Sequence, residues 1–158
     1  TVVLTFVDTA GSNVFEFRTK ARRLLHGKDH GLIIVDYLQL IEPVGRNKND
    51  SMSTAVGEIS RALKVLAKDL KVPVIALSQL NREVDKRPDK RPVLADLRES
   101  GAIEQDADTV TLLHRPCEKE DRGEWDPDML ELYLDKNRRG PTGMVRMAYF
   151  PNTGRIVK

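Results

Sequence analysis

A single carboxylate ends the most apolar short run in the sequence. Residues 32–36 read LIIVD, so four branched apolar residues lead directly to Asp36. Such a run is typical of a strand that is covered on both faces of a parallel sheet. Because ligands bind at the carboxyl edge of such sheets, an Asp there is suited to orient Mg²⁺ or its coordinated water beside a nucleotide. The run alone is weak support, since a polar residue at a strand end is common in α/β proteins.

The sequence contains no phosphate-binding loop that this carboxylate could serve. The motif G-x-x-x-x-G-K-[ST] surrounds phosphates with backbone N–H groups and a lysine. Of the ten glycines, only Gly27 is followed by lysine, and Arg22 and Asp29 stand where the motif needs a glycine and a hydroxyl residue. The G-x-G-x-x-G fingerprint of dinucleotide-binding proteins is also missing.

The elements that must position Asp36 alternate between strands and helices, which favours an α/β architecture. Apolar patterning predicts strands at 2–7, 32–35, 72–78, 109–114, 130–136 and 144–150. It predicts helices at about 14–25, 54–71 and 102–106. The first helix opens with Asn13 and Glu16 in a capping box, and the second carries the clearest apolar stripe.

Composition indicates one globular domain. With 40% hydrophobic and 32% charged residues, the chain can bury a core and does not have the pattern of a disordered segment. Its apolar runs are too short to cross a bilayer, and its N-terminus lacks a signal-peptide pattern. The lone cysteine, Cys117, fits a reducing cytosol, and the three histidines lack the spacing of metal ligands.

The charge distribution permits phosphate binding without demanding it. The net charge is only +2, yet residues 82–91 and 135–146 are both rich in lysine and arginine. An acidic stretch, 116–128, separates them. Runs of this kind are equally typical of solvated surface.

The order of several motifs resembles the DnaB-type bacterial replicative DNA helicases, which are RecA-like hexameric ATPases. The most specific block runs from Ser78 to Asp108 and contains DLRESGAIEQDAD after SQLNR. Further matching pieces are EFRTKARRL at 16–24, VDYLQL at 35–40, EISRALKVLAKDLKVPVIALSQLNR at 58–82 and DKNRRGPTG at 135–143. The resemblance implies a RecA-like core, with a mostly parallel sheet flanked by helices and antiparallel strands at the C-terminal end. It also implies that residues 1–158 are the C-terminal part of a single motor domain, an incomplete domain whose first strand and phosphate loop come earlier.

The resemblance assigns a nucleotide role to four residues, with ATP and Mg²⁺ as cofactors. Asp36 holds Mg²⁺ through water between the β- and γ-phosphates, and Gln79 senses the γ-phosphate from the same sheet edge. Lys136 and Arg138 reach in trans into the nucleotide of a neighbouring subunit. Arg139 lies directly beside Arg138, so which of the two arginines inserts stays open.

The resemblance also implies a DNA-binding segment and a set of partners. Arg98 offers positive charge to phosphate, while the backbone N–H groups of Glu99 and Gly101 contact the single strand. Without the resemblance, DLRESG would be an ordinary capped turn. The implied partners are single-stranded DNA, further copies of the chain in a hexameric ring, a primase and a helicase loader. The implied place is the cytoplasm beside the nucleoid, with no membrane.

We therefore expect part of an ATP-dependent replicative DNA helicase that unwinds duplex at the replication fork. One alternative is another RecA-like ATPase, such as a recombinase or a phage primase–helicase. A second is a truncated, non-enzymatic module that binds DNA or a protein partner. With no phosphate loop of its own, residues 1–158 alone should hydrolyse ATP negligibly.

Overall fold

The computed structural model describes residues 3–8, 12–28, 30–43, 52–116 and 128–158, and of residues 52–53 and 98–100 it describes the backbone alone. The chain divides into two compact units, Thr1–Gln79 and Leu80–Lys158. The 44–51 part of the polar loop around 43–53, and nearly all of the acidic stretch 116–128, lie outside the described residues.

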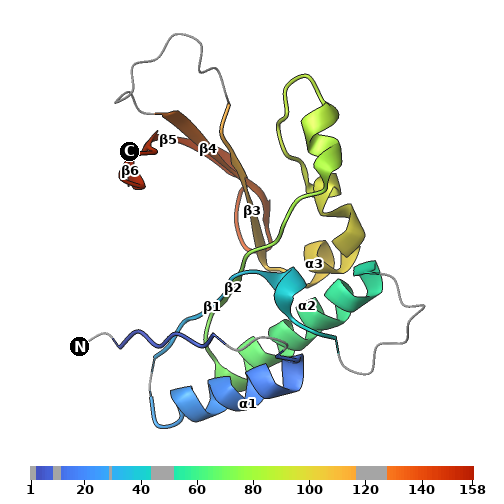
Figure 1. The fold of residues 1–158 in the computed structure, drawn as a ribbon, viewed down its shortest axis with the longest axis vertical. Helices are drawn as coiled ribbons and strands as arrows, with labels where there is room; N and C mark the ends of the chain where they lie inside the picture. Colours follow the sequence, from blue (N-terminus) through green and yellow to red (C-terminus); the bar gives the residue numbers. More distant parts are fainter. Residues whose placement is uncertain (1–2, 9–11, 29, 44–51, 117–127) are drawn as a thin grey trace. The chain divides into compact units, whose positions relative to one another are not determined.

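Unit 1 combines helices with a short parallel sheet. Along the chain it contains helix α1 (Val14–Leu25), strand β1 (Ile33–Val35), the 3₁₀ helix η1 (Leu38–Leu40), helix α2 (Met52–Leu70) and strand β2 (Val74–Ala76). Strands β1 and β2 pair in parallel, with Ile33 opposite Val74. Helix α2 contacts both α1 and β2, so it packs against the other helix and against the sheet (Figure 1).

The helices form where the apolar pattern predicts them. One stripe of α2 is buried, as expected for a helix with apolar residues three and four positions apart: Ala55, Val56, Ile59, Leu63 and Leu66. Asn13 caps α1, since its Oδ1 accepts hydrogen bonds from the N–H groups of Phe15 and Glu16, both at 3.0 Å. Arg18 and Arg22 of α1 both form ion pairs with Asp69 of α2 and so link the two helices.

Two expectations about strands in unit 1 are wrong. The β1 run is covered on one face only, because Val35 is buried whereas Ile34 is 59% exposed. The other apolar residues on that uncovered face are Leu32, Ile75 and Leu77. Residues 3–7, the described part of the strand expected at 2–7, lie in no strand. They have apolar β-forming side chains, but a strand exists only when a neighbouring strand accepts its hydrogen bonds, and none in the described part of the chain does so.

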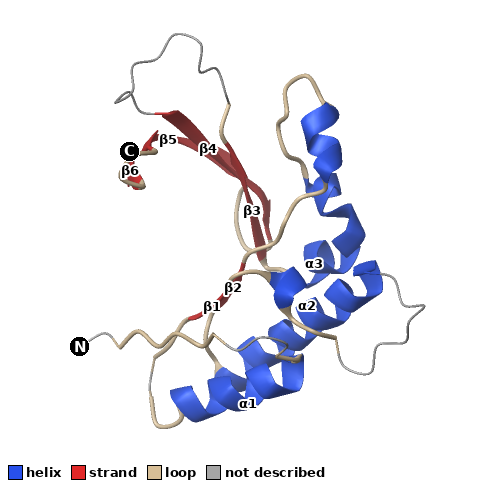
Figure 2. Cartoon of the chain, in the orientation of Figure 1, coloured by secondary structure: helices blue, strands red, loops and turns tan. Residues whose placement is uncertain are grey.

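Unit 2 is built on an antiparallel sheet of four strands in the order β3-β4-β5-β6 (Figure 2). These are β3 (Thr109–His114), β4 (Asp128–Asn137), β5 (Gly143–Phe150) and β6 (Arg155–Val157). The 3₁₀ helices η2 (Arg82–Lys86) and η3 (Leu94–Ser100) precede them, and the short helix α3 (Gly101–Asp106) continues directly from η3. The predicted strands at 109–114, 130–136 and 144–150 are thus confirmed, the last two with extended ends.

The core of unit 2 lies where η3 and the loops around it pack on β3. Leu97, Val110 and Leu112 are buried together, and Leu80, Leu94, Ala107 and Tyr133 pack against them. Leu97 belongs to η3, so the sheet fixes the position of the segment that contains the expected DNA-binding residues. No helix in the described part of the chain is both long and apolar enough to cross a membrane.

Candidate nucleotide and DNA sites

Asp36 and Gln79 follow two neighbouring parallel strands. Asp36 comes directly after β1, and Gln79 comes three residues after the end of β2. The pairing continues beyond β2, because the N–H of Leu77 donates to the carbonyl oxygen of Val35 at 2.9 Å. Both residues therefore lie at the carboxyl edge of the sheet, where α/β proteins bind their ligands.

Gln39 of η1 links the two strand ends, a role that the sequence analysis did not assign to it. Its Nε2 donates to Ser78 Oγ at 3.1 Å, and its Oε1 accepts the backbone N–H of Gln79 at 3.4 Å. The backbone N–H of Leu38 also donates to the carbonyl oxygen of Leu77 at 2.9 Å. Gln39 thus links the turn after Asp36 to the segment that presents Gln79. Its one sequence signal is its place in the VDYLQL motif.

The Asp36 carboxylate suits a magnesium ion that is shared with a nucleotide. It is exposed, and no side chain in the described part of the chain forms an ion pair with it. Nor do the described residues contain a cluster of three or more His, Cys, Asp or Glu side chains that could enclose a metal. Mg²⁺ commonly takes one or two protein carboxylates and completes its shell with water and substrate phosphates. A lone, accessible carboxylate at the ligand edge fits that requirement.

The backbone that leads into the expected DNA-binding segment, residues 98–101, is held in place by several contacts. Asp96 is only 8% exposed, and its Oδ2 accepts the N–H of Val93 at 2.7 Å and pairs with the guanidinium of Arg87. Its backbone oxygen accepts the N–H of Asn81 at 3.1 Å. Together with buried Leu97, these contacts fix the backbone just before residues 98–101. The side chains of Arg98 and Glu99 lie outside the described residues.

Gly101 occupies a position at which this chain has no need of glycine. Its φ of −50° and ψ of −25° are ordinary helical values. A Cβ added there would meet no atom within 4 Å in the described residues beyond its chain neighbours and its own helix. Neither backbone conformation nor packing within the described chain therefore explains the missing side chain, whereas close approach of an external backbone would.

The two expected trans-acting cations are held by the end of α3. Lys136 of β4 donates to the carbonyl oxygen of Glu104. Arg138 donates from Nη2 to the carbonyl oxygen of Gln105 at 3.0 Å and from Nη1 to Asp108 Oδ1 at 3.1 Å. The neighbouring Arg139 is exposed, and its side chain contacts no partner in the described residues. The C-terminal end of α3 and Asp108 thus form one docking position for Lys136 and Arg138, which no sequence pattern predicted.

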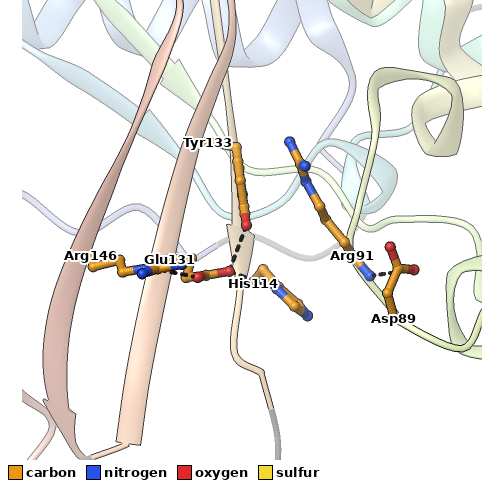
Figure 3. A network of polar contacts seen from close by, with 6 residues as sticks. All are labelled: Asp89, Arg91, His114, Glu131, Tyr133 and Arg146. Atoms are coloured by element: carbon orange, nitrogen blue, oxygen red, sulfur yellow. Dashed lines mark hydrogen bonds and ion pairs between the residues drawn. The ribbon is translucent and has the colours of Figure 1, made fainter.

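A buried carboxylate, Glu131 of β4, contacts three polar side chains of the same sheet (Figure 3). Glu131 accepts hydrogen bonds from Tyr133 Oη at 2.6 Å and Arg146 Nε at 3.0 Å, and its Oε2 lies 3.2 Å from His114 Nδ1. The Tyr133 hydroxyl, followed by His114 and Arg146, lowers the pKa of Glu131 from its usual 4.5, although burial opposes this. The same hydrogen bond and burial raise the pKa of Tyr133 above 10.0.

This network also holds the basic loop that precedes η3. The Arg91 guanidinium lies 4.0 Å from the centre of the Tyr133 ring, a cation–π contact. Glu131 therefore acts through Tyr133 on the 87–93 loop, while Arg87 of that loop pairs with Asp96. The basic residues of this stretch are consequently in part structural.

Comparison with known proteins gives this arrangement a family. The family model described as "DnaB-like helicase C terminal domain" matches residues 1–158, the whole chain. The chain belongs to this family. The resemblance inferred from the motifs is confirmed.

Individual relatives agree with that assignment. The chain is 47% identical over 150 residues to the "Replicative DNA helicase DnaC" of Bacillus subtilis (strain 168), covering 95% of this chain and 33% of that protein. It is 45% identical to the "Replicative DNA helicase DnaB" of Geobacillus stearothermophilus, with the same coverage. The chain thus spans about a third of the length of these relatives.

Solved structures confirm the α/β, RecA-like fold expected from the sequence, as part of a larger domain. One structure, described as "The Structure Of A DnaB-Like Replicative Helicase And Its Interactions With Primase", superposes with a TM-score of 0.84 and 41% identity over 96% of this chain and 37% of that one. A second solved structure, described as an ATPase domain, gives the same TM-score and identity, and the match covers 53% of its length.

Proposed function

We propose that residues 1–158 form the C-terminal part of the motor domain of a replicative DNA helicase, which uses ATP to move along single-stranded DNA and unwind duplex at the fork. The membership of the DnaB-like family supports this, together with relatives that are named replicative DNA helicases. The observation that carries the proposal is the parallel pairing of β1 and β2, because it brings Asp36 and Gln79 to one ligand edge.

In this proposal the ATP site is assembled from three sources. Asp36 orients the water shell of Mg²⁺, and the Gln79 amide, which can donate and accept, responds to the γ-phosphate. A phosphate-binding loop outside residues 1–158 holds the nucleotide. Lys136 and Arg138 come from a neighbouring copy in a hexameric ring and neutralise charge on the transferred phosphoryl group. Bound Mg²⁺, held through water by Asp36, would supply further neutralisation of phosphate charge.

The uncovered apolar face of unit 1 supports the idea of a larger domain. Leu32, Ile34, Ile75 and Leu77 lie exposed on one face of β1 and β2, and two-stranded sheets are seldom stable without further strands or a packed helix. In this proposal the rest of the motor domain covers that face, and units 1 and 2 are parts of one domain.

The DNA-binding part of the proposal rests on residues 98–101. Arg98 pairs with phosphate, and the N–H groups of Glu99 and Gly101 donate to phosphate oxygens, a grip that is independent of base sequence. Further proposed partners are a primase and a helicase loader. The primase has support in a similar helicase whose structure was described together with its primase interactions. The proposed location is the cytoplasm, beside the nucleoid.

The decisive experiment is the Asp36→Ala substitution in the complete protein. We expect ATP hydrolysis and strand displacement on a forked duplex to fall about 10²–10³-fold, the usual loss when a group that stabilises transition-state charge is removed. Because Asp36 is exposed, the thermal unfolding temperature should not change. Glu58→Gln, an exposed carboxylate on α2, is the matched control. Undiminished hydrolysis in the Asp36 variant would remove this residue from the mechanism and with it the proposed site.

One second candidate has a specific observation in its favour. Residues 1–158 contain no phosphate-binding motif, so as an isolated chain they would act only as a module that binds DNA or a protein. The same hydrolysis assay on residues 1–158 alone tests whether the isolated chain is inactive, as this second reading requires. Turnover at background fits either reading of the isolated chain, whereas measurable turnover would show that the chain needs no external phosphate loop.

A further inference from the structure

A bulge in β4 determines which face of the sheet Lys136 occupies. Leu112 pairs with Tyr133 and Thr111 with Leu134, but Val110 then pairs with Lys136, so Asp135 has no residue opposite it. Side chains alternate along a strand, so Tyr133 and Lys136 would normally point to opposite faces. The extra residue at the bulge brings both to the face that Val110 and Leu112 share. That is the face against which Leu97 of η3 packs.

The same alternation carries Arg138 to this face, because it lies two residues beyond Lys136. Its backbone N–H continues the strand pairing by donating to the carbonyl oxygen of Asp108 at 2.8 Å. Lys136 and Arg138 then meet the last turn of α3, whose carbonyl oxygens lack partners within the helix. Glu104 and Gln105 supply those oxygens, and Asp108 supplies a carboxylate.

The contact with Asp108 is open to exchange. The Asp108 side chain is 61% exposed and that of Arg138 is 49% exposed, so water competes with their ion pair. A phosphate group offers arginine more charge and two oxygens at once, and is therefore the stronger partner. An arginine cannot bind Asp108 and a neighbour's nucleotide with the same N–H groups.

From these contacts we infer that Asp108 is a positioning residue. It holds Arg138 in a resting position against its own subunit until a nucleotide phosphate on the neighbouring subunit replaces Asp108 as the partner of Arg138. This inference rests on the proposed function, in which Arg138 acts in trans. The dock stands at one end of α3, and the other end of this six-residue helix is Gly101 of the DNA-binding segment. In this inference, a shift of that segment on binding DNA would reach the dock through α3.

The test is Asp108→Asn in the complete protein, assayed for ATP hydrolysis with and without single-stranded DNA. Loss of the carboxylate should raise DNA-free turnover about two- to fivefold, the scale of an exposed ion pair, and lower the KM for ATP. Turnover with saturating DNA should stay near the wild-type value, so stimulation by DNA falls by the same factor. Asp108→Glu, which keeps the charge, should restore most of the stimulation.

Controls separate this inference from a general loss of structure and from failure of the proposed function. Asp85→Asn removes another exposed carboxylate of unit 2 and should leave both rates unchanged. An Asp108→Asn protein with wild-type DNA-free turnover, or with equal losses with and without DNA, would overturn the resting-position role. If Arg138→Ala hydrolyses ATP at the wild-type rate, the trans mechanism itself fails, and that result is distinct from either outcome for Asp108.

Discussion

Asp36 of unit 1 and Arg138 of unit 2 both lie just after a strand, but they differ in whether their charge has a partner. The Asp36 carboxylate is exposed and pairs with no side chain in the described residues, whereas Arg138 already has a carboxylate and a carbonyl oxygen as partners. An unpaired acceptor at a ligand edge can take a hydrated metal without losing any contact. A docked cation must first exchange partners, and this makes it the natural point for control.

The two sheets differ in the same sense. In unit 2 a buried core forms where η3 packs on β3 and Tyr133 of β4, and a buried carboxylate has three polar neighbours, so these central groups find their partners within the unit. The two strands of unit 1 leave one apolar face open. The centre of unit 2 is thus packed within the unit, although β5 and β6 leave Met144, Val145 and Ile156 exposed, while the strands of unit 1 leave both Asp36 and an apolar face uncovered by the described chain.

The largest effect that bears on this comparison is expected from Arg138→Ala in the proposed ring. If Arg138 acts in trans as proposed, its loss should lower ATP hydrolysis by roughly 10³-fold or more, as for known arginine fingers. Rings that mix wild-type and variant subunits should recover activity where a wild-type neighbour supplies the arginine, measured as turnover against the mixing ratio.

Arg139→Ala is the matched control for that experiment, since Arg139 is adjacent but undocked in the described residues. We expect a small loss there. A large loss for Arg139 with a small one for Arg138 would mean that the docked arginine is structural and the undocked one acts. Activity that scales only with each subunit's own arginine would contradict action in trans.

A smaller effect should come from Gly101→Ala, which tests whether unit 2 also reserves a contact for something outside the chain. The added methyl group meets no atom of the described chain and alanine favours a helix more than glycine does, so the unfolding temperature should not fall. Single-stranded DNA should bind roughly tenfold more weakly, the scale of one lost hydrogen bond to a charged group. The salt dependence of binding should persist, because no cation is removed. Fluorescence anisotropy across a salt series measures both quantities.

Gly143→Ala provides the control, because a Cβ at that position also meets open space. If both variants bind DNA as the wild type does, Gly101 is not a close-approach position. A fall in unfolding temperature for Gly101→Ala would instead show that the chain itself needs this glycine.

The sequence predicts elements well and contacts between them poorly. Helix α2 follows from its apolar stripe, and the strands of unit 2 follow from their β-forming runs, because these patterns are local. The strand expected at 2–7 fails for a reason that no local pattern carries, namely the lack of a neighbouring strand among the described residues. The expectation that β1 is covered on both faces fails for a similar reason, since an apolar run does not reveal what covers it.

The candidate sites divide along the same line. Motifs indicated Asp36, Gln79, Lys136 and Arg138 at or just beyond the ends of strands, which is where the structure has them. The motifs give no role to Gln39 or Asp108, because the roles of these residues depend on hydrogen bonds to residues 40 and 30 positions away. The bulge at Asp135 is also invisible in the sequence, since one unpaired residue changes no composition, yet it decides which face Lys136 occupies.

The smallest effect, Glu131→Gln, asks whether unit 2 really satisfies its own charges. The pKa of Glu131 lies below its usual 4.5 in the folded chain, so the ionised form stabilises the fold. That contribution is fully present above pH 4.5 and is lost as the pH falls through the lower, folded-state value. Replacement by Gln should therefore cost about 1–3 kcal/mol near pH 7, as expected when buried hydrogen bonds to a charged group are weakened.

The difference between wild type and Glu131→Gln should shrink as the pH falls from 4.5 through the lower folded-state pKa, because the carboxyl is then protonated first in the unfolded and finally in the folded chain. Urea unfolding of the complete protein at about pH 7 and at roughly pH 3.5–4.5 measures it, with Glu58→Gln as the exposed control. A difference that is constant with pH would assign the loss to packing around Tyr133 and not to the carboxylate charge. Equal stability near neutral pH would mean that the self-satisfied network of unit 2 contributes order without net stability, which is a known outcome for buried charged groups.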